Sequence, residues 1–257
     1  MQPDTLSLLR NPYTGEILRL EEGKLISDES GRSFPIRNGI PNFLSEISLQ
    51  GRNRRFRWFY DRVAFAYDYV LDLGNTLKIN TERAVRQEYI SRMEISPRAK
   101  ALETAVGTAS NILLLPESGD YYGLDISWQM LRRAQRKLES ADRKAELFQG
   151  DGAFLPFRDD AFDIVFQMGG LQFYSDPLRG VIEMARVAKP GAWVHVIDEV
   201  RGASAVLKRS RIYLESAASK KTATKYLPRL VPKKMINVLS QRIPNSDFYA
   251  LTFRKPG

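Results

Sequence analysis

Residues 101–127 read ALETAVGTASNILLLPESGDYYGLDIS, and this stretch decides the fold. It contains a short apolar strand, a turn of small residues around Gly107, a segment of helical length, and a second strand that ends at Asp125. A turn of small residues lets the backbone approach a ligand, and an acid at a strand end can bind ribose hydroxyls. The stretch therefore predicts one half of a nucleotide-type binding site.

Short apolar runs alternate with segments of helical length through the rest of the chain. We predict strands at 101–105, 121–125, 145–149, 162–167, 193–198 and 248–255, and helices at 111–115 and slightly beyond, 127–140 and 176–189. In the last of these helices Asp176 is the N-cap, and Pro177 occupies the first helical position. The alternation is typical of a parallel sheet with helices on both faces, whose ligands bind at the carboxyl ends of the strands.

The composition limits the chemistry that the chain can perform. Its 257 residues are enough for one full α/β domain with a small appendage. The sequence has no cysteine and one histidine, His195, which excludes disulfides, thiolate zinc sites and multi-histidine centres, so we expect no metal. It has no apolar run of about 18 residues and does not begin like a signal peptide, and we expect a cytoplasmic protein.

The positive charge is concentrated in one segment. The net charge is +9, yet residues 201–242 contain eleven Lys and Arg against the single acid Glu215. The remainder of the chain carries 28 basic and 29 acidic residues and is close to neutral. One segment therefore makes the whole protein basic.

Five motifs carry a resemblance to a known family. They are LETAVGTA at 102–109, GLDIS at 123–127, GDG at 150–152 with LPF at 155–157, FDIV at 162–165 and RVAKPG at 186–191. In this order and at this spacing the motifs resemble the class I S-adenosylmethionine (SAM)-dependent methyltransferases, nearest to the branch that includes quinone-biosynthesis methyltransferases. The resemblance implies an α/β, Rossmann-like, doubly wound and mostly parallel sheet of seven strands with an antiparallel last strand. It also implies S-adenosyl-L-methionine as the cofactor.

The same resemblance implies roles for single residues. Glu103 helps to hold the amino group of the cofactor, Asp125 accepts hydrogen bonds from both ribose hydroxyls, and Gln167 lines the space between sulfonium and acceptor. The full set of cofactor-binding residues that it implies is Glu103, Ala105, Gly107, Thr108, Asp125, Ile126, Asp151, Gly152 and Gln167.

The chain departs from the family pattern in the turn that follows the first strand. Where the usual turn has three glycines, this sequence has Ala105, Gly107 and Ala109. Each added methyl takes room from a close approach, and alanine is disfavoured where the backbone needs a positive φ. We expect this departure to weaken cofactor binding or to abolish it.

Few catalytic side chains are required for methyl transfer from a sulfonium, because positioning supplies most of the catalysis. A phenol or enol acceptor also needs a base, and the candidates are His195, Tyr174 and Asp198. By resemblance to the lid helix of quinone methyltransferases, Tyr67 is a further candidate that closes the pocket over the acceptor. Core packing is the alternative explanation for Tyr67 and for His195.

The first 46 residues have the turn signals and short apolar runs of a small β-ribbon. They resemble the zinc-ribbon domain often fused ahead of such methyltransferases, but without its four cysteines. Because no thiolate is available, we expect a metal-free ribbon that depends on the main domain for its stability. A plain β-hairpin appendage is the alternative. The residues at the four cysteine positions are Asn11, Thr14, Ser27 and Ser30.

We divide the chain into a ribbon at 1–46, lid helices at 47–97 and a SAM-binding domain at 98–257, with the basic segment at 201–242 as an insertion. We predict helices at 204–218 and 230–240 within this insertion. An apolar face flanked by lysines can rest on an anionic membrane surface and admit a lipophilic substrate. The alternatives are a solvated basic face and an RNA-binding surface, although the segment lacks the aromatic stacking platforms of single-strand binders.

The sequence thus predicts a SAM-dependent methyltransferase acting on a small, lipophilic, quinone-like or lipid-like acceptor. A non-catalytic scaffold that keeps the fold is the first alternative, because both the cofactor turn and the ribbon have lost family residues. An RNA methyltransferase is the second. The sequence does not indicate the oligomeric state.

Overall fold

The computed structural model describes residues 3–45, 86–91, 93–200, 223–244 and 246–257. The predicted helix at 204–218 and most of the predicted lid region, with Tyr67, lie outside these described residues.

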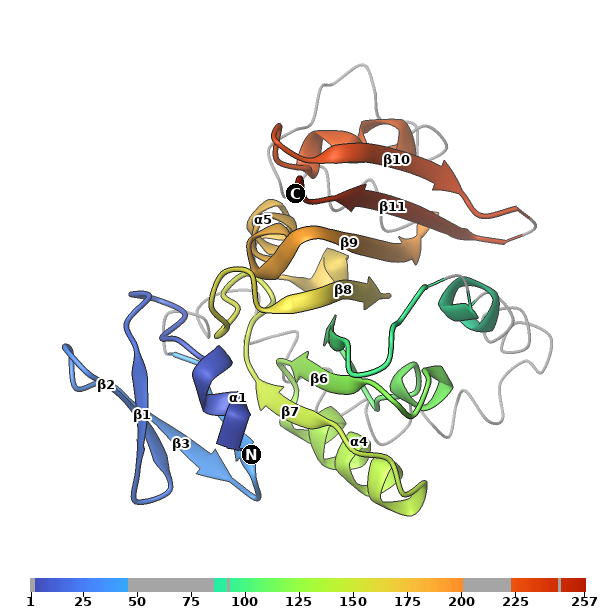
Figure 1. Ribbon diagram of the computed structural model, residues 1–257. Helices are drawn as coiled ribbons and strands as arrows, with labels where there is room; N and C mark the ends of the chain where they lie inside the picture. The colour runs from blue at the N-terminus through green and yellow to red at the C-terminus, as the bar shows by residue number, and fades with distance from the viewer. Residues whose placement is uncertain (1–2, 46–85, 92, 201–222, 245) are drawn as a thin grey trace.

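The main domain is built on a sheet of seven strands (Figure 1). From one edge to the other the order is β10-β11-β9-β8-β5-β6-β7. The five strands from β9 to β7 are parallel, and β11 is antiparallel to both of its neighbours. This topology confirms the predicted Rossmann-like fold with an antiparallel last strand. The strands span Lys100–Thr104 (β5), Asp120–Asp125 (β6), Glu146–Gln149 (β7), Phe162–Met168 (β8), Ala188–Glu199 (β9), Ile236–Arg242 (β10) and Phe248–Arg254 (β11).

Two helices begin at side-chain caps, of which the sequence predicts Asp176, whereas Ser127 was expected as the first helical residue. In α4 (Trp128–Ser140) the Ser127 hydroxyl accepts a hydrogen bond from the Met130 backbone N–H. In α5 (Pro177–Val187) the Asp176 carboxylate accepts one from the Arg179 N–H. Such caps satisfy N–H groups that have no partner within the helix.

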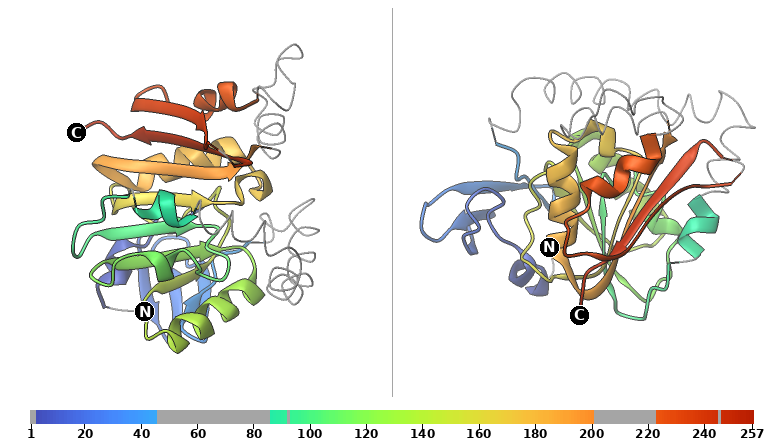
Figure 2. Two further views of the ribbon diagram at one scale, coloured as in Figure 1. Left: turned by 90° about the vertical axis from the view of Figure 1, so that its right-hand side faces the viewer. Right: turned by 90° about the horizontal axis from the view of Figure 1, so that it is seen from above.

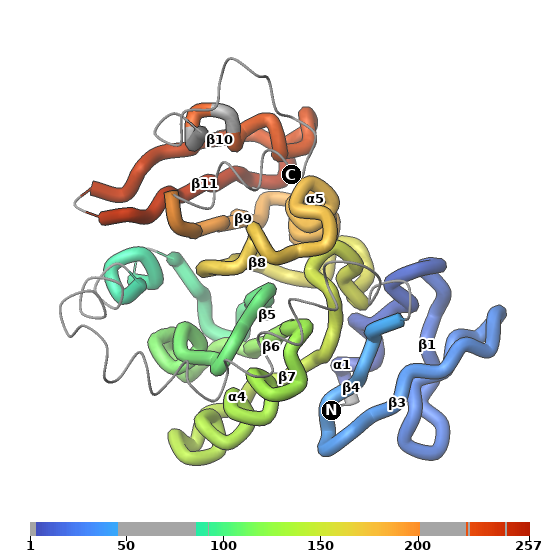
Figure 3. The backbone as a smooth tube through the Cα atoms, turned by 180° about the vertical axis from the view of Figure 1, so that it is seen from behind, coloured from blue at the N-terminus to red at the C-terminus, as the bar shows by residue number. Residues whose placement is uncertain are grey.

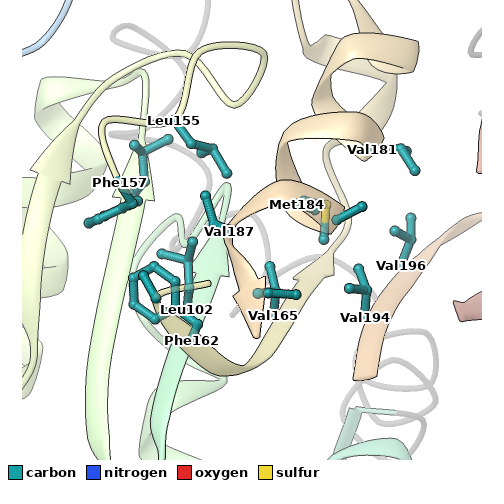
Figure 4. Packing of buried hydrophobic residues seen from close by; sticks show 14 of the residues in the cluster. Leu102, Leu155, Phe157, Phe162, Val165, Val181, Met184, Val187, Val194 and Val196 are labelled. Carbon is teal, nitrogen blue, oxygen red and sulfur yellow. The ribbon is translucent and has the colours of Figure 1, made fainter. Parts of the chain in front are cut away.

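The two helices belong to different hydrophobic clusters, one on each side of the sheet (Figure 2). Side chains along β8 alternate between the clusters, with Val165 in one and Ile164 and Phe166 in the other. Figure 4 shows how Val181 and Met184 of α5 pack against the valines of the central strands. Burial on both faces is what a parallel sheet requires.

The predicted helix at 230–240 is wrong. A 3-10 helix, η4 (Ala223–Leu230), ends there, and the edge strand β10 follows. The pairing of β10 with β11 contains one extra residue between Ile236 and Leu239, where Asn237 adopts a left-handed φ of 53°. Such a bulge interrupts the two-residue alternation of a strand, so the apolar spacing resembled that of a helix.

The predicted helix at 111–115 is a single 3-10 turn, η1 (Ile112–Leu114). Pro116 follows two residues later and cannot continue a helical hydrogen-bond ladder. The connection from β5 to β6 is consequently short, and it places Asn111 directly after the small-residue turn.

The N-terminal segment folds as a ribbon beside β7, at the end of the sheet opposite β10 (Figures 1 and 3). It has four antiparallel strands and shares its core with the main domain, because Leu9, Leu25 and Phe43 are buried in one cluster with Phe148 of β7. Its elements are α1 (Pro3–Leu8), β1 (Leu18–Glu21), β2 (Lys24–Ser27), β3 (Ser33–Arg37) and β4 (Ile40–Pro41).

In the part of the chain that the structure describes, none of the helices has both the length and the apolar character needed to cross a membrane.

Candidate active site

A cavity of about 440 Å³ lies at the carboxyl ends of the parallel strands. Its wall contains residues that directly follow β5, β6, β7 and β8, and residues at the end of β9. A second cavity, of about 380 Å³, lies at the opposite ends of the strands and is lined by 117–122 and 142–146. Because ligands of open α/β sheets bind at the carboxyl ends, the first cavity is the candidate site.

Asp125 fixes the geometry on one side of the cavity. One carboxylate oxygen accepts a hydrogen bond from the Gly107 backbone N–H at 2.8 Å, and the other accepts one from the Ser127 N–H at 2.9 Å. The side chain is 9% exposed. A carboxylate is a hydrogen-bond acceptor, and this one lines the cavity.

The turn after β5 adopts the backbone conformation that glycine favours. Ala105, Gly107 and Ala109 have φ angles of 57°, 55° and 59°. For an alanine this left-handed conformation costs about 1–2 kcal/mol. The expected strain is therefore present, and the chain keeps the family geometry without two of the glycines.

The two alanine methyl groups occupy different environments. Ala109 is fully buried in the cluster that includes Leu131 and Ala134 of α4, so its methyl takes no room from the cavity. Ala105 lines the cavity, which stays open beside it. The expectation that both methyls crowd a ligand is wrong for Ala109.

Most of the cofactor-binding residues that the sequence implies come together on this wall. Asp151 is 3% exposed and accepts a hydrogen bond from the Ala153 N–H at 3.0 Å. Gly152 lies against the Tyr174 ring, which would collide with any side chain at that position. The implied residues on the cavity wall are Ala105, Gly107, Thr108, Asp125, Ile126, Asp151 and Gly152.

Glu103 lies behind the wall. It is 1% exposed and accepts a hydrogen bond from the Asn111 side-chain amide, while its other oxygen has no partner among the described residues. Burial raises the pKa of Glu103 to about 8, and the Asn111 hydrogen bond and the positive charge of Arg86 partly oppose this rise. Asn111 and Arg86 both line the cavity. Neither was predicted as a site residue.

Gln167 does not line the cavity, so its predicted position between sulfonium and acceptor is wrong. It is fully buried, and with its side-chain amide in the orientation that satisfies both oxygen and nitrogen, the oxygen accepts hydrogen bonds from the N–H groups of Gly169, Gly170 and Leu171 at 3.2, 2.7 and 2.9 Å. The Asp198 carboxylate also accepts from Gly170 and Leu171, at 3.1 and 2.9 Å. Gln167 therefore holds the turn after β8, while its neighbour Met168 reaches the cavity.

The position of His195 gives no support to its predicted role as a base. It lies within β9 outside the cavity lining, between the rings of Tyr89 and Trp193. Burial lowers the pKa of His195 to about 4, so it is neutral near pH 7. Tyr174 does line the cavity, but burial raises its pKa far above the ordinary value. Tyr174 is therefore protonated near pH 7 and is poorly suited to act as a base.

The end of the cavity nearest β8 and β9 has a different character. Met168, Phe173 and Phe248 supply apolar surface, and Asp198 and Glu199 supply carboxylates. Burial raises the pKa of Asp198, although three backbone N–H groups bind its carboxylate. This end can accept a flat apolar molecule with a polar group.

Comparison with known proteins agrees with this geometry. The profile of the family described as methyltransferase domain matches residues 102–196. The chain is 32% identical over 154 residues to a demethylmenaquinone methyltransferase of Bacillus mycoides, an alignment that covers 58% of this chain and 64% of that protein. The chain thus spans less than two thirds of the length of this relative.

Solved structures show the same fold at lower identity. A SAM-dependent methyltransferase from Aquifex aeolicus is 18% identical, with a TM-score of 0.52 over 73% of this chain and 97% of that one. The [4+2]-cyclase SpnF is 16% identical, with a TM-score of 0.57 over 79% and 97% of the two chains. Since one fold carries different chemistries, function must be argued from the site.

Replacing Ala105 or Ala109 by glycine should stabilise the protein. Each substitution relieves a left-handed alanine, and we expect Ala105→Gly to gain about 1 kcal/mol in the free energy of unfolding in urea. The gain for Ala109→Gly should be smaller, because it also removes a fully buried methyl group that contributes about 0.8 kcal/mol. Ala134→Gly on α4 is the matched control and should lose at least about 1 kcal/mol, because glycine is unfavourable within a helix. A loss in all three variants would show that the turn is not strained.

Glu103→Gln should change how stability depends on pH. Because the folded pKa of Glu103, about 8, lies above its ordinary value of 4.5, the folded state retains a proton that the unfolded state releases. Wild-type stability therefore falls as the pH rises from about 4.5 to 8, by a few kcal/mol at about 1.4 kcal/mol per pKa unit. Urea unfolding between pH 5 and 9 should give Glu103→Gln an advantage that grows with pH. Parallel profiles would contradict the assignment.

Proposed function

We propose that the chain is a class I SAM-dependent methyltransferase that transfers a methyl group from SAM to a small, lipophilic, quinone-like acceptor. The observation that carries the proposal is the open cavity beside the Asp125 carboxylate, which two backbone N–H groups hold in place.

The residues on the cavity wall fit SAM. Asp125 would accept the ribose hydroxyls, and Ile126 and Gly152 would contact the adenine. At the other end Asn111 has a buried amide oxygen without a partner among the described residues, and it can accept a hydrogen bond from the cofactor's ammonium group. Arg86 would pair with the carboxylate. When bound, the cofactor supplies a methyl group on a sulfonium, which is already a good leaving group.

The acceptor end supports a quinone-like substrate. Met168, Phe173 and Phe248 provide an apolar surface for a ring, and the relatives at 32% identity are named demethylmenaquinone methyltransferases. Methylation at an activated ring carbon or at a hydroxyl releases a proton. Asp198 would take it, because this carboxylate lines the cavity and burial raises its pKa towards the range that suits a general base.

Binding and turnover test this proposal. We expect S-adenosylhomocysteine to bind measurably in calorimetry, and Asp125→Asn to weaken it at least about tenfold, because hydrogen bonds to a charged group contribute about 1.5–3 kcal/mol each. Asp120→Asn, on the exposed opposite end of β6, is the control and should bind like wild type. Methyl-labelled SAM should then transfer its label to a reduced naphthoquinone extracted into organic solvent. An absence of binding heat in the wild type would refute the proposal.

We also propose that the basic segment places the protein on an anionic membrane surface. Lys233 and Lys234 are exposed beside Ile236 and Leu239, which are 45% and 51% exposed. The bulge in β10 aligns both apolar residues with the same face of β11, opposite Arg254 and Thr252. Exposed apolar side chains next to lysines suit an anionic lipid surface, from which a lipophilic acceptor could be drawn.

Sedimentation with vesicles tests the membrane proposal. Wild type should bind phosphatidylglycerol vesicles more tightly than phosphatidylcholine vesicles, and binding should weaken as salt rises. Replacing both Lys233 and Lys234 by glutamate should reduce binding at least about tenfold, since each basic residue contributes about 1 kcal/mol near such a surface. Lys144→Glu, exposed near the start of β7, is the control. Equal binding by all three proteins would exclude this surface.

A further inference from the structure

We infer that the N-terminal ribbon (residues 3–45) positions the cofactor loop, residues 149–158, and so controls the affinity of the cavity for the adenosyl end of the cofactor. The inference rests on the proposed function, because it gives the ribbon a role at the same site. The cofactor loop carries Asp151 and Gly152, which line the cavity.

The ribbon holds the start of the cofactor loop. Directly after β4, Phe43 donates its backbone N–H to the Gln149 carbonyl at 2.8 Å, and Asn42 forms a parallel bridge to the same residue. Gln149 is the last residue of β7, so the ribbon is bridged to the edge strand of the main sheet at this point. The point at which the chain leaves the sheet to form the cavity wall is therefore fixed by ribbon backbone.

The ribbon also holds the end of the cofactor loop. The Arg10 N–H donates to the Pro156 carbonyl at 3.0 Å, and the Arg158 N–H donates to the Leu8 carbonyl at 2.8 Å. Between these bonds Leu9 and Phe157 form an antiparallel bridge, and both side chains are fully buried. The backbone groups at both ends of the loop thus find their partners in the ribbon, as buried backbone groups must.

Tyr13 links the two anchor points to the middle of the loop. Its hydroxyl donates to the Phe43 carbonyl at 2.7 Å, and its ring lies 5.4 Å from the ring of Phe154. The Arg179 guanidinium of α5 also contacts Phe154, at 3.9 Å from the ring centroid. Phe154 is thereby placed by the ribbon through Tyr13 and by the main domain through Arg179.

A hydrogen-bonded cluster orients Tyr13. Asn11 donates to the Ser27 hydroxyl at 2.8 Å, both residues are fully buried, and the Asn11 amide oxygen accepts from the Tyr13 N–H at 3.0 Å. Thr14 and Ser30 are at the other two positions that the zinc-ribbon resemblance assigns to cysteines. The Ser30 hydroxyl donates to the Glu16 carboxylate, and the Thr14 hydroxyl accepts from the Glu16 backbone N–H. Ser27, Asn11 and Tyr13 are thus joined by hydrogen bonds, and Tyr13 contacts the loop through its ring.

The inner side of the loop is held separately by α5. Arg186 donates to the carbonyls of Leu155 and Phe157 at 3.1 and 2.7 Å. The loop is therefore clamped between helix and ribbon. Removing the ribbon contacts should loosen residues 150–154 while α5 keeps the domain folded, because local openings need less free energy than global unfolding.

Two Tyr13 variants and one distant control test the inference. Tyr13→Ala removes the ring contact and the hydroxyl bond, and Tyr13→Phe removes the hydroxyl bond alone. Leu138→Ala truncates a buried side chain near the C-terminal end of α4, in the cluster on the other face of the sheet from Leu9 and Phe157. For each protein, calorimetry would give the Kd of S-adenosylhomocysteine and hydrogen exchange would report on the amides of 150–154, at a temperature where circular dichroism shows all of them folded.

We expect Tyr13→Ala to raise the Kd at least fivefold and to accelerate exchange in 150–154, with a two- to threefold rise in Kd for Tyr13→Phe. Leu138→Ala should lower Tm but leave the Kd within twofold of wild type. Unchanged Kd and exchange in both Tyr13 variants would overturn the inference. If wild type fails to bind, the proposed function fails, and the exchange of 150–154 still decides whether the ribbon holds the loop. If Tyr13→Ala does not fold, Tyr13→Phe provides both readings.

Discussion

The fold and the site both depend on the hydrogen bonds that the Asp125 carboxylate accepts from Gly107 and Ser127. One bond ties the end of β6 to the turn after β5, and the other ties it to the start of α4. Two adjacent parallel strands and the following helix are thereby joined at a single buried charge. The turn and the carboxylate that it binds both line the cavity, so these bonds fix one side of its wall.

This arrangement explains how the chain keeps a family geometry after losing family residues. Ala105 and Ala109 adopt left-handed backbone conformations that normally select glycine, and the bond from Gly107 to Asp125 helps to maintain them. In the ribbon, the Asn11 and Ser27 side chains bond each other at two positions where the zinc-ribbon resemblance places cysteines. The ribbon shares its hydrophobic core with the main domain.

The sequence predicted what local patterns encode. The order of the central strands and helices, the Asp176 cap, and the acid at the end of β6 followed from periodicity and motif spacing. The predictions from sequence failed where contacts between residues far apart in the chain determine the structure. The bulge at Asn237 breaks the alternating pattern of β10, so this edge strand was not predicted. Gln167 is near the end of a strand, and from that position alone the sequence cannot tell whether its side chain is buried or lines the cavity. Asn111 was missed because its importance comes from its hydrogen bond to Glu103, eight residues earlier.

The central claim is that the strained turn still leaves room for an adenosyl sulfonium beside Asp125. A crystal structure with bound S-adenosylhomocysteine tests this claim most directly. Our account predicts the ribose hydroxyls within hydrogen-bond distance of the Asp125 carboxylate, with Ala105 and Ala109 still in the left-handed conformation. Density for the ligand at another location, or a turn rebuilt so that the Ala105 methyl fills the cavity, would contradict it.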